Sequence, residues 1–174
     1  MRPIDTVIME VQSETPLIKT LRLDRSLDPH PGQYAMVWIR GLDEVPMSFS
    51  GPDTITVQSV GEASEALNSL GEGRSIGLRG PLGKGFTLLG ERILIIGGGV
   101  GTAPLAFLGE QAMNAGMEVT SLIGYRCCSD MIFLKRFQRL GKTIVTTDDG
   151  SSGIRGRVAA GLEALDLEIG RAHV

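Results

Sequence analysis

The pattern of hydrophobic residues changes near residue 90, and this change limits the folds open to the chain. Before residue 90 the apolar runs are short, rich in β-branched and aromatic residues, and separated by turns such as Asp28-Pro29-His30-Pro31-Gly32. Strands are predicted at residues 5–11, 17–23, 34–39, 54–59 and 76–79, with one short helix at 63–70. Closely spaced short strands favour a small antiparallel β barrel, whose closure removes exposed strand edges.

After residue 90, strand and helix patterns alternate. Strands are predicted at residues 92–96, 118–123 and 143–147, and helices at 102–115, 130–140 and 155–165, with Ser129 as the N-cap of the second helix. Strands and helices that alternate at this spacing form crossovers and a parallel sheet. The predicted fold class is therefore an antiparallel β barrel over residues 1–90 followed by an α/β, parallel-sheet nucleotide-binding domain over residues 91–167.

Composition excludes several classes of function. The 174-residue chain has a net charge of -3 and only 5% aromatic residues, which argues against nucleic-acid binding by charge or by base stacking. It begins without an apolar signal segment, and no apolar run approaches the ~20 residues of a membrane helix, so we expect no membrane association. Cys127 and Cys128 are the only cysteines. A reducing, cytoplasmic location is expected, and no metal site is predicted.

Glycine is in excess, with 24 residues, and its densest group follows the strand at 92–96. The run Ile96-Gly97-Gly98-Gly99-Val100-Gly101-Thr102-Ala103-Pro104 passes from a buried strand into a helix. Glycine lets the main chain approach a pyrophosphate, and a helix N-terminus attracts its charge. The alternative is a tight turn that binds nothing. The next strand ends at Gly124-Tyr125-Arg126, without the acid of the usual dinucleotide fingerprint, so a classical dehydrogenase is disfavoured.

Three further segments are candidates for contacts with a cofactor. Pro46 fixes the main chain, and Ser48 could hydrogen-bond a flat heterocycle, although an edge strand with a proline is an equal alternative. The segment Gly61-Glu62-Ala63-Ser64 could bind a second phosphate or simply cap a short helix. Asp148-Asp149-Gly150 follows the third parallel strand, where ligands of open α/β sheets lie. It could bind ribose hydroxyls or form an Asx turn.

The order of these segments is more specific than any one of them. A Pro-x-Ser turn at 46–48, a Gly-x-x-Ser helix start at 61–64, a Gly-Pro-Leu-Gly loop at 80–83 and the glycine-rich turn at 97–104 together resemble the ferredoxin–NADP reductase superfamily. Within it, residues 80–86, 97–105 and 148–151 are most similar to the electron transfer subunits of dihydroorotate dehydrogenases. The resemblance covers residues 4–165. It implies that the barrel binds FAD, that the α/β domain binds NAD(H), and that Ser48 is the catalytic residue. The cofactor-binding residues that it implies are Val45, Pro46, Met47, Ser48, Thr56, Val57, Gln58, Gly61, Ala63, Ser64, Gly97, Gly98, Gly99, Gly101, Thr102, Ala103, Pro104, Asp148, Asp149 and Gly150.

The resemblance also implies an enzyme, an FAD-dependent NAD(P)H oxidoreductase. Electrons from NADH would pass through FAD and a [2Fe–2S] cluster to FMN on a separate dihydroorotate dehydrogenase catalytic subunit, in a hetero-oligomer that serves pyrimidine biosynthesis. One alternative is another reductase of the superfamily, linked to ferredoxin, a hydrogenase or sulfur compounds. The other is a flavin- or nucleotide-binding module without turnover. Arg126 follows the second parallel strand, where it could meet a 2′-phosphate, so the choice between NADH and NADPH stays open.

The chain departs from the pattern of this family at two points. Val45 stands where the flavin motif often has an arginine that pairs with the FAD phosphate. The family also continues with a further strand, bearing a Cys-Gly-Pro-type turn, and a cysteine cluster that ligates the [2Fe–2S] centre. Cys127 and Cys128 do not match those positions, so the α/β domain is expected to be incomplete and the cluster to lie in a missing C-terminal segment. Residues 168–174 match a translated sequencing adaptor and are expected to be non-native.

Overall fold

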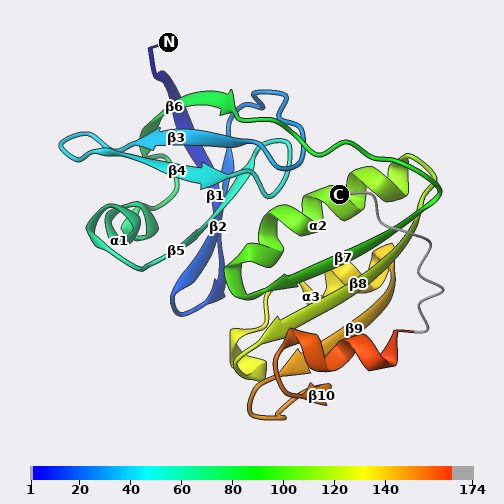
Figure 1. Ribbon diagram of the computed structural model, residues 1–174. Helices are drawn as coiled ribbons and strands as arrows, with labels where there is room; N and C mark the ends of the chain where they lie inside the picture. Colours follow the sequence, from blue (N-terminus) through cyan, green and yellow to red (C-terminus); the bar gives the residue numbers. More distant parts are fainter. Residues whose placement is uncertain (1, 166–174) are drawn as a thin grey trace.

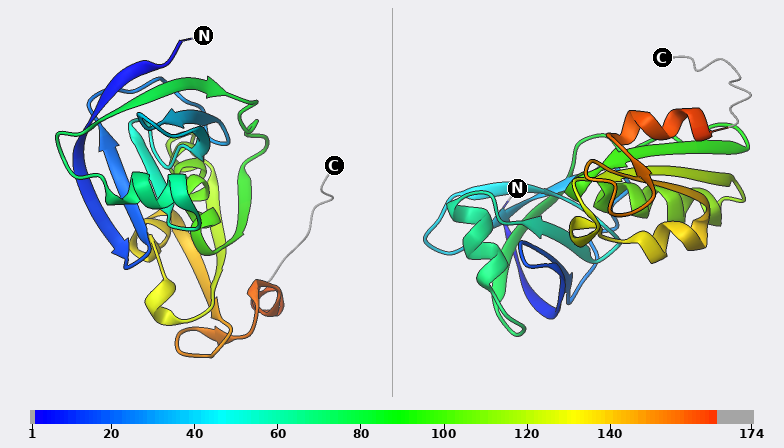
Figure 2. Two further views of the ribbon diagram at one scale, coloured as in Figure 1. Left: turned by 90° about the vertical axis from the view of Figure 1, so that its left-hand side faces the viewer. Right: turned by 90° about the horizontal axis from the view of Figure 1, so that it is seen from below.

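The computed structural model describes residues 2–165 and contains two sheets, joined by the segment 83–91 (Figure 1). The first sheet is antiparallel and has the strand order β4-β3-β6-β1-β2-β5. An isolated bridge between Phe49 and Ile55 links its two outer strands, and the strands curve round into a barrel in the left view of Figure 2. The six strands are β1 (Ile4–Thr15), β2 (Ile18–Leu23), β3 (Tyr34–Trp38), β4 (Glu44–Ser48), β5 (Thr54–Gln58) and β6 (Ser75–Leu82).

The barrel is filled by alternate side chains of its strands. Because successive side chains of a strand point to opposite faces, each strand contributes every second residue to the interior. Burial of each such aliphatic side chain contributes about 1.5–3 kcal/mol. Helix α1 (Glu62–Ser69) adds Leu67 to the same core. The fully buried residues from five of the strands include Ile8, Leu21, Val37, Ile55 and Leu78.

The second sheet is parallel, in the order β10-β9-β8-β7. Helices α2 (Thr102–Asn114) and α3 (Leu134–Leu140) cover one face, and the 3-10 helix η3 (Val158–Ala164) covers the other (Figure 2, right view). Helices on both faces are the usual arrangement for a parallel sheet. The predicted fold class, an antiparallel barrel followed by a parallel α/β unit, is confirmed. The strands are β7 (Arg92–Gly98), β8 (Glu118–Tyr125), β9 (Gly141–Thr147) and β10 (Ile154–Arg155), and the two further 3-10 helices are η1 (Gly99–Gly101) and η2 (Cys128–Asp130).

Two predicted helices are wrong in extent or type. The helix expected at 130–140 begins only at Leu134, and Ser129 lies in η2 and caps nothing. Phe133, with a φ of 60°, departs from helical geometry, so α3 starts only after it. The helix expected at 155–165 is instead β10 followed by η3. There the main-chain N–H of Gly156 donates to Thr147 at 2.8 Å and keeps the first residues extended beside β9.

The segment around Pro46 is an edge strand, which confirms that interpretation of residues 45–50. Strand β4 ends the strand order of the barrel, and Pro46 lies opposite Met36 of β3. A proline cannot donate to a strand ladder, so an edge is where it is tolerated. The predicted non-native tail, residues 168–174, lies outside the described residues. No helix within residues 2–165 is long and apolar enough to cross a membrane.

Candidate functional site

A cavity of about 550 Å³ lies between the two sheets, within the range of small-molecule sites. Its walls come from the turn between β1 and β2 and from the carboxyl ends of β7, β8 and β9. This is where open α/β sheets bind their ligands. The lining residues are Thr15, Pro16, Leu17, Ile18, Gln58, Gly98, Gly99, Val100, Gly124, Tyr125, Arg126, Ser129, Asp130, Asp148, Arg157 and Val158.

Four of the residues predicted to bind a cofactor line this cavity: Gln58, Gly98, Gly99 and Asp148. They come from three separate segments of the sequence, so the fold brings together part of the predicted set. The other predicted members of the glycine-rich turn and of the 148–150 segment lie within a few residues of them in the sequence but do not line the cavity. Those members are Gly97, Gly101, Thr102, Ala103, Pro104, Asp149 and Gly150.

Three glycines line the floor of the cavity, and each has a different reason to lack a side chain. Gly98 of β7 pairs with Gly124 of β8, and a Cβ added to Gly98 would lie 3.3 Å from the Gly124 carbonyl oxygen. A Cβ on Gly124 would lie 2.9 Å from both Thr146 Oγ1 and Val158 Cβ. Gly99 adopts a φ of 54°, which side chains disfavour. This cradle fits the close approach of main chain to a phosphate that a nicotinamide nucleotide requires.

A buried tyrosine holds the glycine-rich turn in place. The hydroxyl of Tyr125 donates to the Ile132 carbonyl at 2.7 Å and lies 3.3 Å from Thr102 Oγ1. Thr102 in turn donates to the Gly99 carbonyl at 2.8 Å. Burial raises the pKa of Tyr125 above its ordinary value of 10.0, against the opposing effect of these two hydrogen bonds. At neutral pH the phenol is therefore a neutral donor that ties β8 to the first turn of α2.

Charged groups of both signs surround the cavity. Arg126 pairs with Asp130 at 2.8 Å and is largely exposed, whereas Arg157 makes no ion pair among residues 2–165 and lines the cavity directly. Asp149 accepts hydrogen bonds from the main chain and the hydroxyl of Ser151, which hold its pKa below the ordinary value. Asp149 thus forms the Asx turn, and of these two neighbouring acids Asp148 is the one that lines the cavity.

The predicted flavin contacts on the barrel differ in exposure. On β4, Pro46 and Ser48 are exposed, whereas Val45 and Met47 pack against the barrel core. On β5, Val57 is fully buried, so its side chain is directed away from any ligand. Thr56 is also buried and binds other barrel hydroxyls. These two residues can therefore offer a ligand only main-chain groups.

The predicted phosphate site at the start of α1 has an open N-terminus. No atom lies within 4 Å of a Cβ built on Gly61. The hydroxyl of Ser64 is already engaged: it accepts from the main-chain N–H groups of Val60 and Gly61, at 2.9 and 3.0 Å, and donates to the Gly61 carbonyl. A phosphate here would have to bind main-chain N–H groups of residues such as Ala63 rather than this hydroxyl.

Of the barrel's contribution to the cavity, sequence reasoning predicted Gln58 but missed the turn between β1 and β2. The turn at Thr15–Ile18 carries no motif, and only the fold shows that it faces the nucleotide-binding turn. Arg157 is a second such residue, because the sequence pattern predicts a helix over its segment, where the structure has β10 and η3. The two cysteines are free, with Cys127 half-buried and Cys128 exposed. Among residues 2–165 no three His, Cys, Asp or Glu side chains are placed to hold a metal ion.

The barrel, the parallel sheet and the cavity between them define the class of fold. The structure is similar to that of an NADH-dependent reduced ferredoxin-NADP oxidoreductase, with a TM-score of 0.83 and 24% sequence identity over 94% of this chain and 64% of that one. This likeness shows the two-domain fold of ferredoxin reductase-like proteins. No family model matches the chain.

The sequence relatives then identify the family. The chain is 52% identical over 170 residues to a protein of Methanocella arvoryzae, covering 97% of this chain and 66% of the relative. It is 39% identical over 163 residues to a protein of Archaeoglobus fulgidus, covering 94% and 67%. Each is named "Probable dihydroorotate dehydrogenase B (NAD(+)), electron transfer subunit". The chain belongs to the family of dihydroorotate dehydrogenase B electron transfer subunits, and it spans about two thirds of the length of these relatives.

Proposed function

We propose that the chain binds FAD and a nicotinamide nucleotide and carries electrons from NADH toward a dihydroorotate dehydrogenase catalytic subunit. The observation that carries this proposal is the cavity between the barrel and the carboxyl ends of the parallel strands. The glycine floor of the cavity suits a pyrophosphate. The relatives of the chain are named as probable electron transfer subunits of a NAD(+)-linked enzyme. FAD, when bound, would supply the exchange between a two-electron donor and single-electron transfer.

The residues of the chain position and orient the two cofactors. The exposed edge of β4, with Pro46 and Ser48, would contact the flavin ring, and Ser48 would hydrogen-bond it. The start of α1 and the main chain of β5 would bind the rest of FAD. The cavity would take the nucleotide, with Asp148 available to ribose hydroxyls and Arg157 to phosphate.

The partner and the cluster belong to the same proposal. The protein would pass electrons to an FMN-containing catalytic subunit in pyrimidine biosynthesis. A [2Fe–2S] cluster needs four ligands, usually thiolates, and this chain supplies two neighbouring cysteines. The cluster would therefore be bound by a segment that corresponds to the third of the relatives that this chain does not span.

Flavin reconstitution tests the proposed cofactors and electron donor. We expect the protein to bind FAD, to turn yellow, and to be bleached under anaerobic conditions by NADH at lower concentrations than by NADPH. Preference for NADPH would reject the assigned donor. Binding of FAD without bleaching by either nucleotide would support a flavin-binding module without turnover, and no affinity for FAD would reject the proposal.

A serine substitution tests the predicted catalytic residue. Ser48→Ala should slow flavin reduction by about tenfold or more, because one hydrogen bond of about 1.5 kcal/mol is lost near the reacting ring. Ser13→Ala is the matched control, since Ser13 is another exposed strand serine of the barrel. Equal reduction rates in the two variants would remove Ser48 from the reaction.

A further inference from the structure

Side chains from each half of the molecule enter the core of the other. Phe107 of α2 is 2% exposed and belongs to the barrel core, and Ile18 of β2 is 5% exposed and belongs to the core around the parallel sheet. Arg136 of α3 makes a third, polar contact between the halves. The two halves therefore meet through packed side chains and through a hydrogen bond from Arg136 to a main-chain carbonyl of the barrel.

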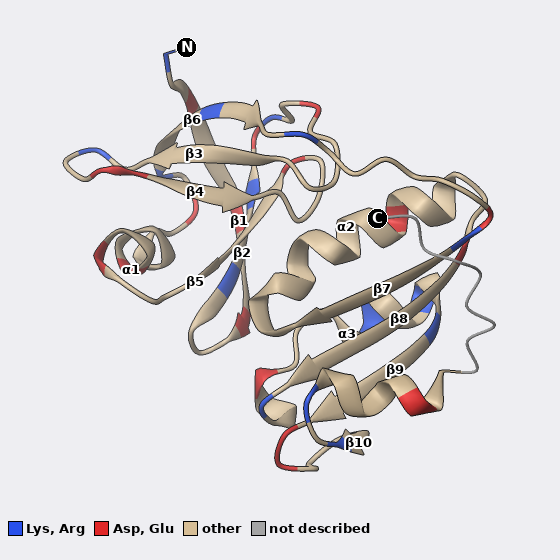
Figure 3. Ribbon diagram, in the orientation of Figure 1, with Lys and Arg blue, Asp and Glu red and all other residues tan. Residues whose placement is uncertain are grey.

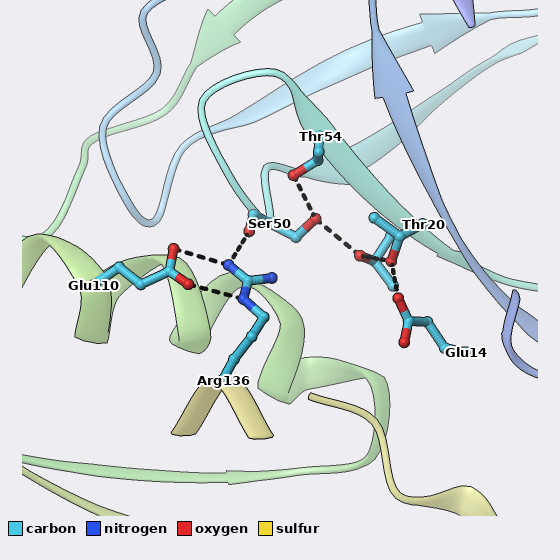
Figure 4. A network of polar contacts seen from close by, with 7 residues as sticks. Glu14, Thr20, Ser50, Thr54, Glu110 and Arg136 are labelled. Atoms are coloured by element: carbon cyan, nitrogen blue, oxygen red, sulfur yellow. Dashed lines mark hydrogen bonds and ion pairs between the residues drawn. The ribbon is translucent and has the colours of Figure 1, made fainter. Parts of the chain in front are cut away.

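Arg136 joins three elements through one guanidinium (Figure 4). Its Nε and Nη2 donate to the two carboxylate oxygens of Glu110 on α2, at 2.8 and 2.9 Å. Nη2 also donates to the main-chain carbonyl of Ser50 in the barrel, at 2.9 Å. The guanidinium carbon lies 4.6 Å from the ring centre of Phe133. Figure 3 shows α2 uncharged along most of its length, and Glu110 is its only charged residue.

A chain of hydroxyl groups extends this contact into the barrel. Thr56 donates to Ser50 Oγ at 2.8 Å and lies 3.0 Å from the hydroxyl of Thr20, which donates to Glu14 at 2.8 Å. Burial raises the pKa of Glu14, while the bond from Thr20 and the charge of Arg136 lower it. Glu14 precedes Thr15, which lines the cavity. The contact thus reaches the barrel wall of the candidate site.

The two partners of Arg136 lie close in sequence to the proposed flavin strand and on the helix that follows the nucleotide-binding turn. Ser50 follows Ser48 by two residues at the end of β4, and Glu110 lies on the helix that begins directly after the glycine-rich turn. A shift of the guanidinium would therefore move the flavin strand relative to the nucleotide turn. Lysine could not replace it, because a point-like ammonium lacks the planar fork that reaches the carboxylate and the carbonyl together.

We propose that Arg136 is a positioning residue that fixes the flavin-bearing strand of the barrel at the distance from the nucleotide-binding turn that hydride transfer requires. The inference rests on the proposed function. Reaction between two bound groups depends steeply on their separation and alignment, and displacements near 1 Å can cost ~100-fold in rate. Substitution of Arg136 should therefore change the rate of the chemical step more than the affinity for either cofactor.

Stopped-flow reduction of the FAD-loaded protein by NADH tests the positioning role. For Arg136→Lys and Glu110→Gln we expect the limiting rate of flavin reduction to fall at least tenfold, while the dissociation constants of FAD and NADH stay within about twofold. The matched control is Arg139→Lys, an exposed arginine on α3 that makes no ion pair among residues 2–165. A limiting rate unchanged in Arg136→Lys, or lost affinity at an unchanged limiting rate, would overturn the proposal.

Amide hydrogen exchange gives a second readout that needs no turnover. In Arg136→Lys we expect faster exchange both at residues 49–51 and at 98–102, and in Arg139→Lys at neither. Exchange that changes in one segment alone would refute the coupling, because the two segments would then not share a support. If NADH fails to bleach the wild-type protein, the proposed function fails, and the exchange experiment still decides whether Arg136 couples the two segments.

Discussion

Removal of the Tyr125 hydroxyl should loosen the nucleotide-binding turn and destabilise the protein. In Tyr125→Phe the buried Ile132 carbonyl loses a donor at 2.7 Å, and Thr102 loses a neighbour at 3.3 Å. A buried acceptor left without its partner costs about 1–3 kcal/mol. For a protein of this length each kcal/mol lowers the melting temperature by about 2–4 °C, so a fall of roughly 4–8 °C is expected for the middle of that range. Differential scanning calorimetry measures this shift.

The pH dependence of the same variant gives an independent check. The pKa of Tyr125 is raised in the folded protein, so the unfolded chain releases this proton at lower pH than the folded one. The free energy of unfolding of the wild type should therefore fall as pH rises above about 10, and Tyr125→Phe should lack that part of the fall. Tyr34→Phe is the control, because the half-buried Tyr34 hydroxyl makes no hydrogen bond among residues 2–165. Equal melting temperatures for the two variants would refute the reasoning.

Three other measurements address the site and its surroundings. Arg157→Ala should weaken NADH binding about tenfold in fluorescence titrations, through loss of a charge-assisted hydrogen bond to phosphate, whereas the neighbouring Arg155→Ala should not. Glu14→Gln should raise the free energy of unfolding at pH 7 but not at pH 3.5 in urea titrations. The reason is that the pKa of Glu14 is raised in the folded protein, so its ionisation lowers stability as pH rises above 4.5. The control Glu163→Gln, at an exposed residue, should leave the free energy of unfolding unchanged at both pH values. The exposed thiol of Cys128 should react with an aromatic disulfide reagent. NADH should slow this reaction, because Cys128 lies in the sequence between Arg126 and Ser129, which both line the cavity. Equal labelling rates with and without NADH would contradict this.

The fold was accessible to sequence reasoning because its signals are local. Short β-branched runs with turn residues indicated the barrel, and a buried strand that ends in glycines and continues as a helix indicated the parallel sheet. The failures arose where distant contacts overrode a local pattern. The segment after Ser129 has helical spacing, but the Ile132 carbonyl accepts the Tyr125 hydroxyl and Phe133 adopts a positive φ, so the helix begins later.

The candidate site could be predicted only in part from the sequence, and Thr56 shows the reason. Ile55 and Val57 fill the barrel core, so strand alternation directs the Thr56 side chain to the opposite face. That face would normally be open to a ligand. Here Thr56 is 8% exposed, because β5 contacts η1 of the other half and the hydroxyl bonds within the barrel. A sequence pattern shows which face a residue occupies but not what covers that face.

The two cores, each of which contains a side chain from the other half, explain why residues of both halves line the cavity. The sequence changes pattern near residue 90, between the two sheets, yet Phe107 and Ile18 each lie in the core on the opposite side of that point. Ile18 also lines the cavity, at the end of the turn that begins with Thr15. The packing that seats Ile18 against the parallel sheet therefore also places this turn against the glycine floor. The burial of Phe107 and Ile18, together with the hydrogen bond from Arg136 to the Ser50 carbonyl, then sets the relative orientation of the halves. The nucleotide turn therefore meets the barrel at a fixed place in the fold.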